Sequence, residues 1–258
     1  MSDAVLVLYG AISAYVENLV YLPTIDSTHE TALRLMQQMD EEDQQLRTTV
    51  LIARHQTGGH GREGRPWQSP EGGLYLNWVR SDVDHTIINM LPMLAAAAAT
   101  EAATKAGIAN VGIKWPNDLL VDGAKIGGIL VHVRRGDTIW ATIGLGLNVA
   151  TKPRLPGDAT PPVTCLADHI ASRPIDAWIS ELTVDFLAAL DQGIEDPQIA
   201  RTRWRERLIH QPGDTLEVRL ASGEQVRGHY AGVTNDGYLM LENDTGTRTV
   251  SSGEIFGR

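Results

Sequence analysis

The stretch of this sequence best suited to chemistry is residues 56–69, Gln-Thr-Gly-Gly-His-Gly-Arg-Glu-Gly-Arg-Pro-Trp-Gln-Ser. Its glycines let backbone N–H groups turn toward an anion and approach it closely. Arg62 and Arg65 add planar forks of donors that fit phosphate and carboxylate oxygens. The composition therefore predicts an anion-binding loop, and a surface loop without chemistry is the alternative.

A second group of polar residues lies between positions 114 and 129. Lys-Trp-Pro-Asn-Asp occupies 114–118, and Lys-Ile-Gly-Gly-Ile occupies 125–129. The Asp122-Gly123 pair between them predicts a tight hairpin turn, which places Lys125 just after the turn. Lysines beside turns are usually solvated, so the position alone does not separate a catalytic lysine from a surface one.

The order of residues in these segments resembles that of biotin protein ligases. Residues 59–67 resemble the GRGRxGRxW loop of that family, and residues 114–129 resemble its KWPND…K(I/L)xGI signature. Residues 26–28, Asp-Ser-Thr, resemble its Asp-Ser-Thr-Asn segment, and residues 144–149 resemble its GxGLN segment. The resemblance extends over residues 26–254.

Two positions depart from the family pattern. His60 stands where the family has its first loop arginine, and His29 stands where it has an asparagine. Ser27 and Glu30 also fit a capping box, in which each side chain satisfies a free N–H at the start of a helix. The cap alone explains Ser27, and a ligand contact at the same helix N-terminus is compatible with it.

The resemblance implies ATP-dependent attachment of biotin to a specific lysine of a biotin carboxyl carrier protein, through a biotinyl-5′-AMP intermediate. It implies ATP and biotin as substrates with Mg²⁺, and Lys125 bridging the biotin carboxylate and the α-phosphate. Trp67 is expected to stack on the adenine. The implied catalytic residues are Lys125 and Arg62; the implied biotin-binding residues are Ser27, Thr28, Gln56, Gly59, His60, Arg62, Lys125, Gly144 and Gly146; the implied ATP-binding residues are Arg62, Arg65, Trp67, Asn117, Asp118, Lys125 and Asn148; Asp118 is the expected magnesium contact.

The elements that must position these residues follow from hydrophobic periodicity and turn residues. A helix is expected to begin after Ser27, and Gly107 should end another over 84–107. Strands are predicted at 50–54, 74–79, 111–115, 119–121, 125–133 and 137–149; after a loop at 151–162, helices are predicted at 163–170, 176–190 and 197–208.

The sequence changes character at residues 210–214, His-Gln-Pro-Gly-Asp. Short alternating runs separated by turns follow, which predict a small β-barrel of about five strands. Its closing Val-Ser-x-Gly-Glu, residues 250–254, resembles the SH3-like C-terminal domain of biotin ligases. We therefore expect an α/β catalytic domain over 1–210, with a mixed central sheet flanked by helices, and an SH3-like domain over 211–258.

The bulk composition limits the function classes. The 258 residues carry a net charge of −10, which disfavours general nucleic-acid binding. One cysteine, Cys165, excludes an internal disulfide framework. No signal peptide or membrane span is predicted, so the expected compartment is the cytoplasm. The expected partner is the carrier protein, without DNA or membrane, and the chain is expected to be a monomer or weak homodimer.

Two other functions compete with this interpretation. Lipoate ligases and octanoyltransferases share the expected sheet and a catalytic lysine, but they generally lack the loop at 56–67 with its tryptophan. A biotin-responsive repressor would carry a DNA-binding domain as well. Only about two dozen residues precede Asp26, and no basic recognition helix is evident among them, so a monofunctional ligase is expected.

Overall fold

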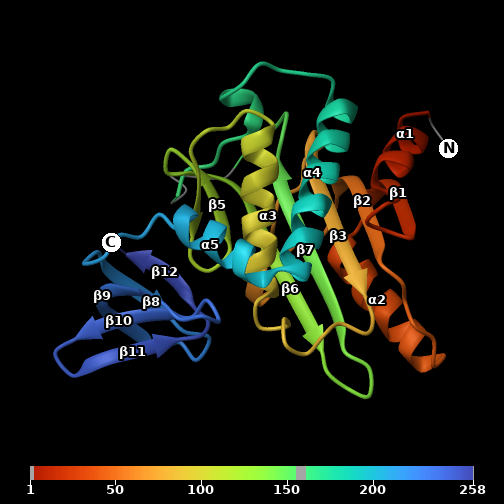
Figure 1. The fold of residues 1–258 in the computed structure, drawn as a ribbon. Helices are drawn as coiled ribbons and strands as arrows, with labels where there is room; N and C mark the ends of the chain where they lie inside the picture. Colours follow the sequence, from red (N-terminus) through yellow and green to blue (C-terminus); the bar gives the residue numbers. More distant parts are fainter. Residues whose placement is uncertain (1–2, 155–160, 258) are drawn as a thin grey trace.

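The computed structural model describes residues 3–154 and 161–257, and it contains a large mixed sheet followed by a smaller antiparallel one (Figure 1). The seven-stranded sheet has the order β1-β2-β3-β7-β6-β5-β4. Only the β1–β2 pair is parallel. The strands are β1 Asn18–Ile25, β2 Thr49–Gln56, β3 Gly73–Arg80, β4 Val111–Lys114, β5 Asp118–Val121, β6 Ala124–Arg134 and β7 Trp140–Asn148.

Helices cover both faces of this sheet, and the alternation of side chains along the strands separates two cores. Val50 and Ile52 of β2 belong to the main core, whereas Leu51 between them belongs to a smaller core on the opposite face. Helices α1 Asp3–Ile12, α3 Leu91–Lys105, α4 Ile175–Glu195 and α5 Pro197–Arg207 contribute to the main core, and α2 Thr28–Glu41 contributes to the smaller one.

The alanine run of α3 explains how closely this helix packs. Residues 95–99 are all alanine, and each is at most 3% exposed. Small side chains allow the helix to approach the sheet and α4 at once. Trp178, Phe186 and Trp204 are buried, as predicted for core residues of the last two helices.

The C-terminal residues form a five-stranded antiparallel sheet in the order β11-β10-β9-β8-β12. Its strands are β8 Thr215–Arg219, β9 Gln225–Val233, β10 Leu239–Asn243, β11 Gly246–Val250 and β12 Glu254–Gly257. Trp115, next to β4, donates its indole N–H to the carbonyl of Gly237 at 2.9 Å, which ties the C-terminal unit to the seven-stranded sheet. The predicted α/β class and five-stranded C-terminal unit are confirmed.

Two expectations about single elements are wrong, and two elements were missed. The helix predicted over 84–107 begins at Leu91, because Asp84 accepts from the Thr86 N–H in a turn and Pro92 sits in the first helical turn. The helix predicted over 163–170 is only a 3-10 turn, Leu166–Asp168, since Val163 bridges to Lys125 instead. Strand β1 and helix α1 were not predicted at all.

Part of the loop predicted at 151–162 lies outside the described residues, namely 155–160. Within the described ranges, no helix is long and apolar enough to cross a membrane.

Candidate active site

A cleft of about 400 Å³ opens between the large sheet, the 56–69 loop and the C-terminal sheet. Every predicted site residue lines it except Gly59. A Cβ on Gly59 would lie 2.6 Å from Ser69 Oγ and 2.7 Å from the Trp67 carbonyl, so this glycine is packed into the wall. The predicted residues in the lining are Ser27, Thr28, Gln56, His60, Arg62, Arg65, Trp67, Asn117, Asp118, Lys125, Gly144, Gly146 and Asn148.

Lys125 stands in the cleft with a carboxylate beside it. Its Nζ lies 2.6 Å from Asp118 Oδ1 and 5.2 Å from the centroid of the Trp67 ring. The hairpin that joins β5 and β6 brings the two charged residues together, with a register shift between Leu119 and Leu120. The ammonium is therefore held in place by an ion pair and an aromatic face.

The 56–69 loop is a narrow hairpin rather than an extended lid. Gln56 bridges to Ser69 and His60 bridges to Pro66 as isolated antiparallel pairs. The tip, η1 Arg62–Gly64, has positive φ angles of 57° at Glu63 and 69° at Gly64. The glycine at the tip thus occupies backbone space that most side chains avoid.

Both arginines of the loop reach the C-terminal sheet. Arg62 Nη1 donates to the Gly253 carbonyl at 3.0 Å and to Asn117 Oδ1 at 3.4 Å, while Arg65 pairs with the carboxylate of Glu254. Burial lowers the pKa of the Arg62 guanidinium, although neighbouring Glu63 opposes the shift. Arg62 has neutral oxygen partners here, so an anionic ligand would be a stronger partner for it than those it has.

The start of α2 forms the opposite wall. Ser27 Oγ accepts from the Glu30 N–H at 3.3 Å, which confirms Ser27 as the helix cap. Thr28 donates both its backbone N–H and its hydroxyl to Gln56 Oε1, at 2.8 and 3.0 Å, and Gln56 Nε2 donates to Ser69 Oγ at 2.8 Å. Gln56 therefore fixes the Thr28 hydroxyl in addition to lining the cleft.

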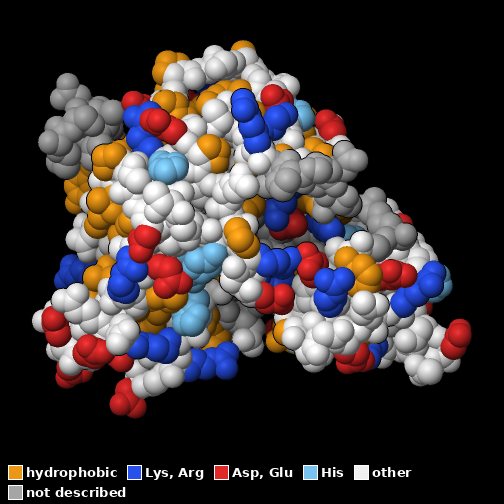
Figure 2. Space-filling view, turned by 180° about the vertical axis from the view of Figure 1, so that it is seen from behind, with side chains coloured by type: hydrophobic (Ala, Val, Ile, Leu, Met, Phe, Trp, Pro, Cys, Tyr) orange, Lys and Arg blue, Asp and Glu red, His pale blue; other side chains and the backbone are white. Residues whose placement is uncertain are grey.

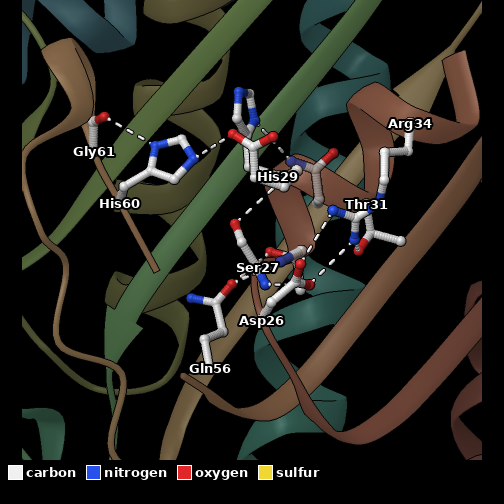
Figure 3. A network of polar contacts seen from close by, with 11 residues as sticks. Asp26, Ser27, His29, Thr31, Arg34, Gln56, His60 and Gly61 are labelled. Atoms are coloured by element: carbon white, nitrogen blue, oxygen red, sulfur yellow. Dashed lines mark hydrogen bonds and ion pairs between the residues drawn. The ribbon is translucent and has the colours of Figure 1, made fainter. Parts of the chain in front are cut away.

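The other half of the predicted capping box is wrong. Glu30 turns to the loop, where its Oε1 lies 2.7 Å from His60 Nε2, and the Ser27 N–H is taken by Asp26 Oδ1 at 2.7 Å (Figure 3). His29 is 7% exposed and lies edge-on to His60, with ring centroids 5.6 Å apart. The two departures from the family pattern are thus in contact.

Two buried polar atoms in the cleft wall have no hydrogen-bond partner, Trp67 Nε1 and Asn148 Oδ1. Asn148 is 1% exposed, and its Nδ2 donates to the Thr164 carbonyl at 2.9 Å. Because buried polar atoms are normally bonded, these two are positions where a ligand would supply the missing partner.

The described residues contain no group of three or more His, Cys, Asp or Glu side chains placed to hold a metal ion. Asp118 is a single carboxylate, already beside Lys125. One carboxylate supplies only part of the oxygen shell that Mg²⁺ prefers.

Several residues that build the site were not predicted. Asn77 and Thr142 form a buried hydrogen-bonded pair behind the cleft, and Asn77 Nδ2 lies 3.4 Å from His29 Nδ1. Gly253 and Glu254 hold the loop arginines. Glu254 was part of the predicted closing motif, but nothing in the sequence connects it with a loop almost two hundred residues away.

Comparisons with known proteins agree with this geometry. A family model described as the biotin/lipoate A/B protein ligase family matches residues 21–148, and one described as the biotin protein ligase C terminal domain matches residues 217–258. The biotin--[acetyl-CoA-carboxylase] ligase of Paracoccus denitrificans is 30% identical over 91% of this chain and 98% of its own length. The Mycobacterium tuberculosis protein of the same name is 31% identical over 80% of this chain and 77% of its own length.

The bifunctional ligase/repressor BirA of Escherichia coli is 29% identical over 91% of this chain and 72% of its own length. Among solved structures, a biotin protein ligase from Aquifex aeolicus in complex with biotin and ATP has a TM-score of 0.73 at 23% identity, over 93% of this chain and 98% of that one. This structural likeness shows the fold.

Proposed function

The chain belongs to the biotin protein ligase family, and on this premise we propose which of its residues carry out the ATP-dependent attachment of biotin to a carrier protein. The observation that carries the proposal is the convergence of Lys125, Arg62 and Arg65 on one cleft whose other wall presents Ser27 and Thr28. Cations and hydroxyl groups that line one cleft suit a substrate with an anionic end and a polar, uncharged end.

In the first step, a carboxylate oxygen of biotin attacks the α-phosphorus of ATP and pyrophosphate leaves. Two anions must approach each other, so cations between them lower the barrier. Lys125 is positioned for this role because Asp118 and Trp67 hold its ammonium at the cleft wall. Arg62 and Arg65 would bind phosphate oxygens. Arg62 would exchange neutral oxygen partners for anionic ones, whereas Arg65 would exchange the Glu254 carboxylate for a phosphate.

In the second step, the amine of the carrier lysine attacks the carbonyl carbon of biotinyl-5′-AMP, and AMP leaves. The head of biotin is a cyclic urea that offers both donors and acceptors, which suits Ser27, Thr28 and Gln56. Gly144 and Gly146 line the same cleft, and the missing side chain of Gly146 lets the Trp67 indole pack directly against β7. Trp67 and Asn148 each have a buried polar atom to offer the nucleotide or biotin.

Magnesium enters this scheme as part of the nucleotide substrate. We assign the second carboxylate oxygen of Asp118, Oδ2, as a contact to the magnesium ion, since Mg²⁺ prefers carboxylate and phosphate oxygens. The carrier domain would bring its lysine to the open mouth of the cleft. We place the domain boundary at 210/211, between α5 and β8, and we expect the protein to act in the cytoplasm as a monomer or weak homodimer.

The lipoate alternative is weakened by a specific observation. The family model that matches residues 21–148 describes biotin and lipoate enzymes alike. The model that matches residues 217–258 describes the C-terminal domain of biotin protein ligases alone, so it favours biotin. The test is to incubate the chain with MgATP, biotin and a biotin carboxyl carrier domain, and to follow the mass of that domain. Gain of one biotinyl group on its acceptor lysine is expected; gain of a lipoyl group instead would contradict the proposal.

A further inference from the structure

The two residues at which this chain departs from its family's motifs lie against each other beside the cleft. His60, from the 56–69 loop, and His29, from α2, have ring centroids 5.6 Å apart at an interplanar angle of 84°. Between the same loop and helix, Glu30 reaches His60 at 2.7 Å (Figure 3). Figure 2 shows histidine side chains close together left of the centre of the view, next to acidic and basic ones.

The surroundings of His60 fit a protonated ring. Its Nε2 faces the carboxylate oxygen Oε1 of Glu30 at 2.7 Å, and its Nδ1 faces the carbonyl oxygen of Gly61 at 3.3 Å. Both partners are acceptors, whereas a neutral imidazole has only one N–H. The imidazolium form is the one that satisfies both contacts, and it pairs with Glu30 in charge as well.

The surroundings of His29 fit the opposite state. Its Nδ1 lies 3.4 Å from Asn77 Nδ2, whose own amide oxygen accepts from the Thr142 hydroxyl. His29 therefore accepts at Nδ1 and stays neutral. Burial, with smaller effects from His60 and His132, lowers the pKa of His29 to about 4. Of the two rings, His60 is therefore the one whose contacts fit a positive charge.

We propose that Glu30 and His60 form a proton-dependent clasp that holds the 56–69 loop against the start of α2 and so positions the biotin pocket. The inference rests on the proposed function. The clasp joins the middle of the loop to the helix turn that presents Ser27 and Thr28. Glu30 is a positioning residue here, because it acts on the pocket through His60.

The direction of the pH effect follows from the contacts. A neutral His60 keeps one N–H and loses its charge, so it cannot satisfy both Glu30 and Gly61. The groups around the ring are Glu30 and His29 from α2, with His132 of β6 beyond His29 at 6.3 Å. Protonation supplies the second N–H that these two acceptors, Glu30 and Gly61, need, so the clasp should weaken as the pH rises and this proton is lost.

The first measurement is biotin affinity by calorimetry at pH 6, 7 and 8. Ordinary carboxyl groups, such as that of biotin, stay ionised throughout this range. Wild type should bind on the order of fivefold more weakly at pH 8 than at pH 6, as expected for one partly exposed ion pair. His60→Arg keeps a permanent cation opposite Glu30 and should bind equally at both pH values. Glu30→Gln should bind weakly already at pH 6 and show no slope.

Glu224→Gln is the matched control, since it breaks an exposed carboxylate–arginine pair outside the cleft and should retain the wild-type slope. A flat wild-type profile, or a wild-type slope in Glu30→Gln, would overturn the clasp. A general loss of folding in Glu30→Gln would lower affinity without removing the slope, so the slope separates positioning from stability.

The second measurement needs no ligand and separates the clasp from the proposed function. Hydrogen exchange of the loop amides, corrected for the intrinsic pH dependence of exchange, should show more protection at pH 6 than at pH 8 in wild type and equal protection in His60→Arg. If the chain binds no biotin but this difference holds, the clasp stands and the proposed function fails. If the chain binds biotin and the loop shows no difference, the clasp fails.

Discussion

The ammonium of Lys125 lies 2.6 Å from a carboxylate oxygen of Asp118, and both side chains are about one-quarter exposed at the cleft wall. The lysine is therefore fixed before any substrate arrives, and an incoming anion has to share it with Asp118. This preorganisation lets a single cation act on two anionic reactants without first having to be ordered.

Replacing Lys125 with alanine should leave a folded protein that forms little biotinyl-5′-AMP. Loss of a charge contact made in the transition state should slow single-turnover adenylation roughly a hundredfold or more. Lys152→Ala, which also removes a lysine paired with an aspartate, is the control, because that pair is exposed and outside the cleft. Near-normal adenylation by Lys125→Ala would rule out the assigned role.

Asp118→Asn should affect both the rate and the magnesium requirement. The neutral amide holds Lys125 less firmly, and it is a poorer ligand for Mg²⁺ than a carboxylate. Adenylation measured against magnesium concentration should have a lower maximum and a higher half-saturating concentration. A lower maximum at an unchanged half-saturating concentration would confine Asp118 to its contact with Lys125.

Gly146→Ala should displace Trp67. A Cβ on Gly146 would lie 2.8 Å from Trp67 Nε1, so the indole must shift, at a cost of about 1–3 kcal/mol for an overpacked site. We expect weaker biotin binding and an altered near-ultraviolet circular dichroism signal. Gly136→Ala is the control, since its Cβ would meet nothing closer than 3.8 Å. An unchanged tryptophan signal in Gly146→Ala would contradict the prediction and show that the backbone of β7 moves instead of the indole.

Arg62→Gly should speed the loss of biotinyl-5′-AMP more than it slows its formation. Arg62 anchors the loop tip to Gly253 and Asn117, and its charge is available to the phosphate of the intermediate. The off-rate of preformed intermediate and the biotinylation of bystander proteins should rise together. An unchanged off-rate with slower adenylation would reduce Arg62 to a catalytic cation.

His29 should make the fold less stable in acid. Its pKa is lowered to about 4, mainly by burial, from an ordinary value near 6.5. Below about pH 6.5, His29 binds a proton in the unfolded chain but stays neutral in the folded chain. The free energy of unfolding is therefore unaffected by His29 above that pH and decreases as the pH falls toward 4. Denaturant unfolding should show a loss of about 2 kcal/mol between pH 7 and pH 4.5 that His29→Asn reduces. His85→Asn, at an exposed histidine, is the control and should leave the loss of stability unchanged. An unchanged loss in His29→Asn would show that the protonation of His29 does not cause it.

The sequence motifs predicted which residues line the cleft, but not the tertiary contacts that position their side chains. Lys125 and Asp118 could be expected to meet, since a hairpin turn separates them by a few residues. Glu30 could not be assigned from local rules, because a tertiary partner, His60, displaced it from the capping box that its spacing predicts. The contacts of Arg62 and Arg65 with residues 253 and 254 depend on how two sheets pack, which no local pattern encodes.

The most direct test of the proposed activity is pyrophosphate release from MgATP with biotin, lipoate and octanoate supplied in parallel. The cleft is lined by the cations Lys125 and Arg62 and by the hydroxyl groups of Ser27 and Thr28. It therefore predicts release with biotin and little with the two acids that lack a urea ring. Release with lipoate or octanoate at a rate equal to or above that with biotin would contradict the assignment of this cleft to biotin.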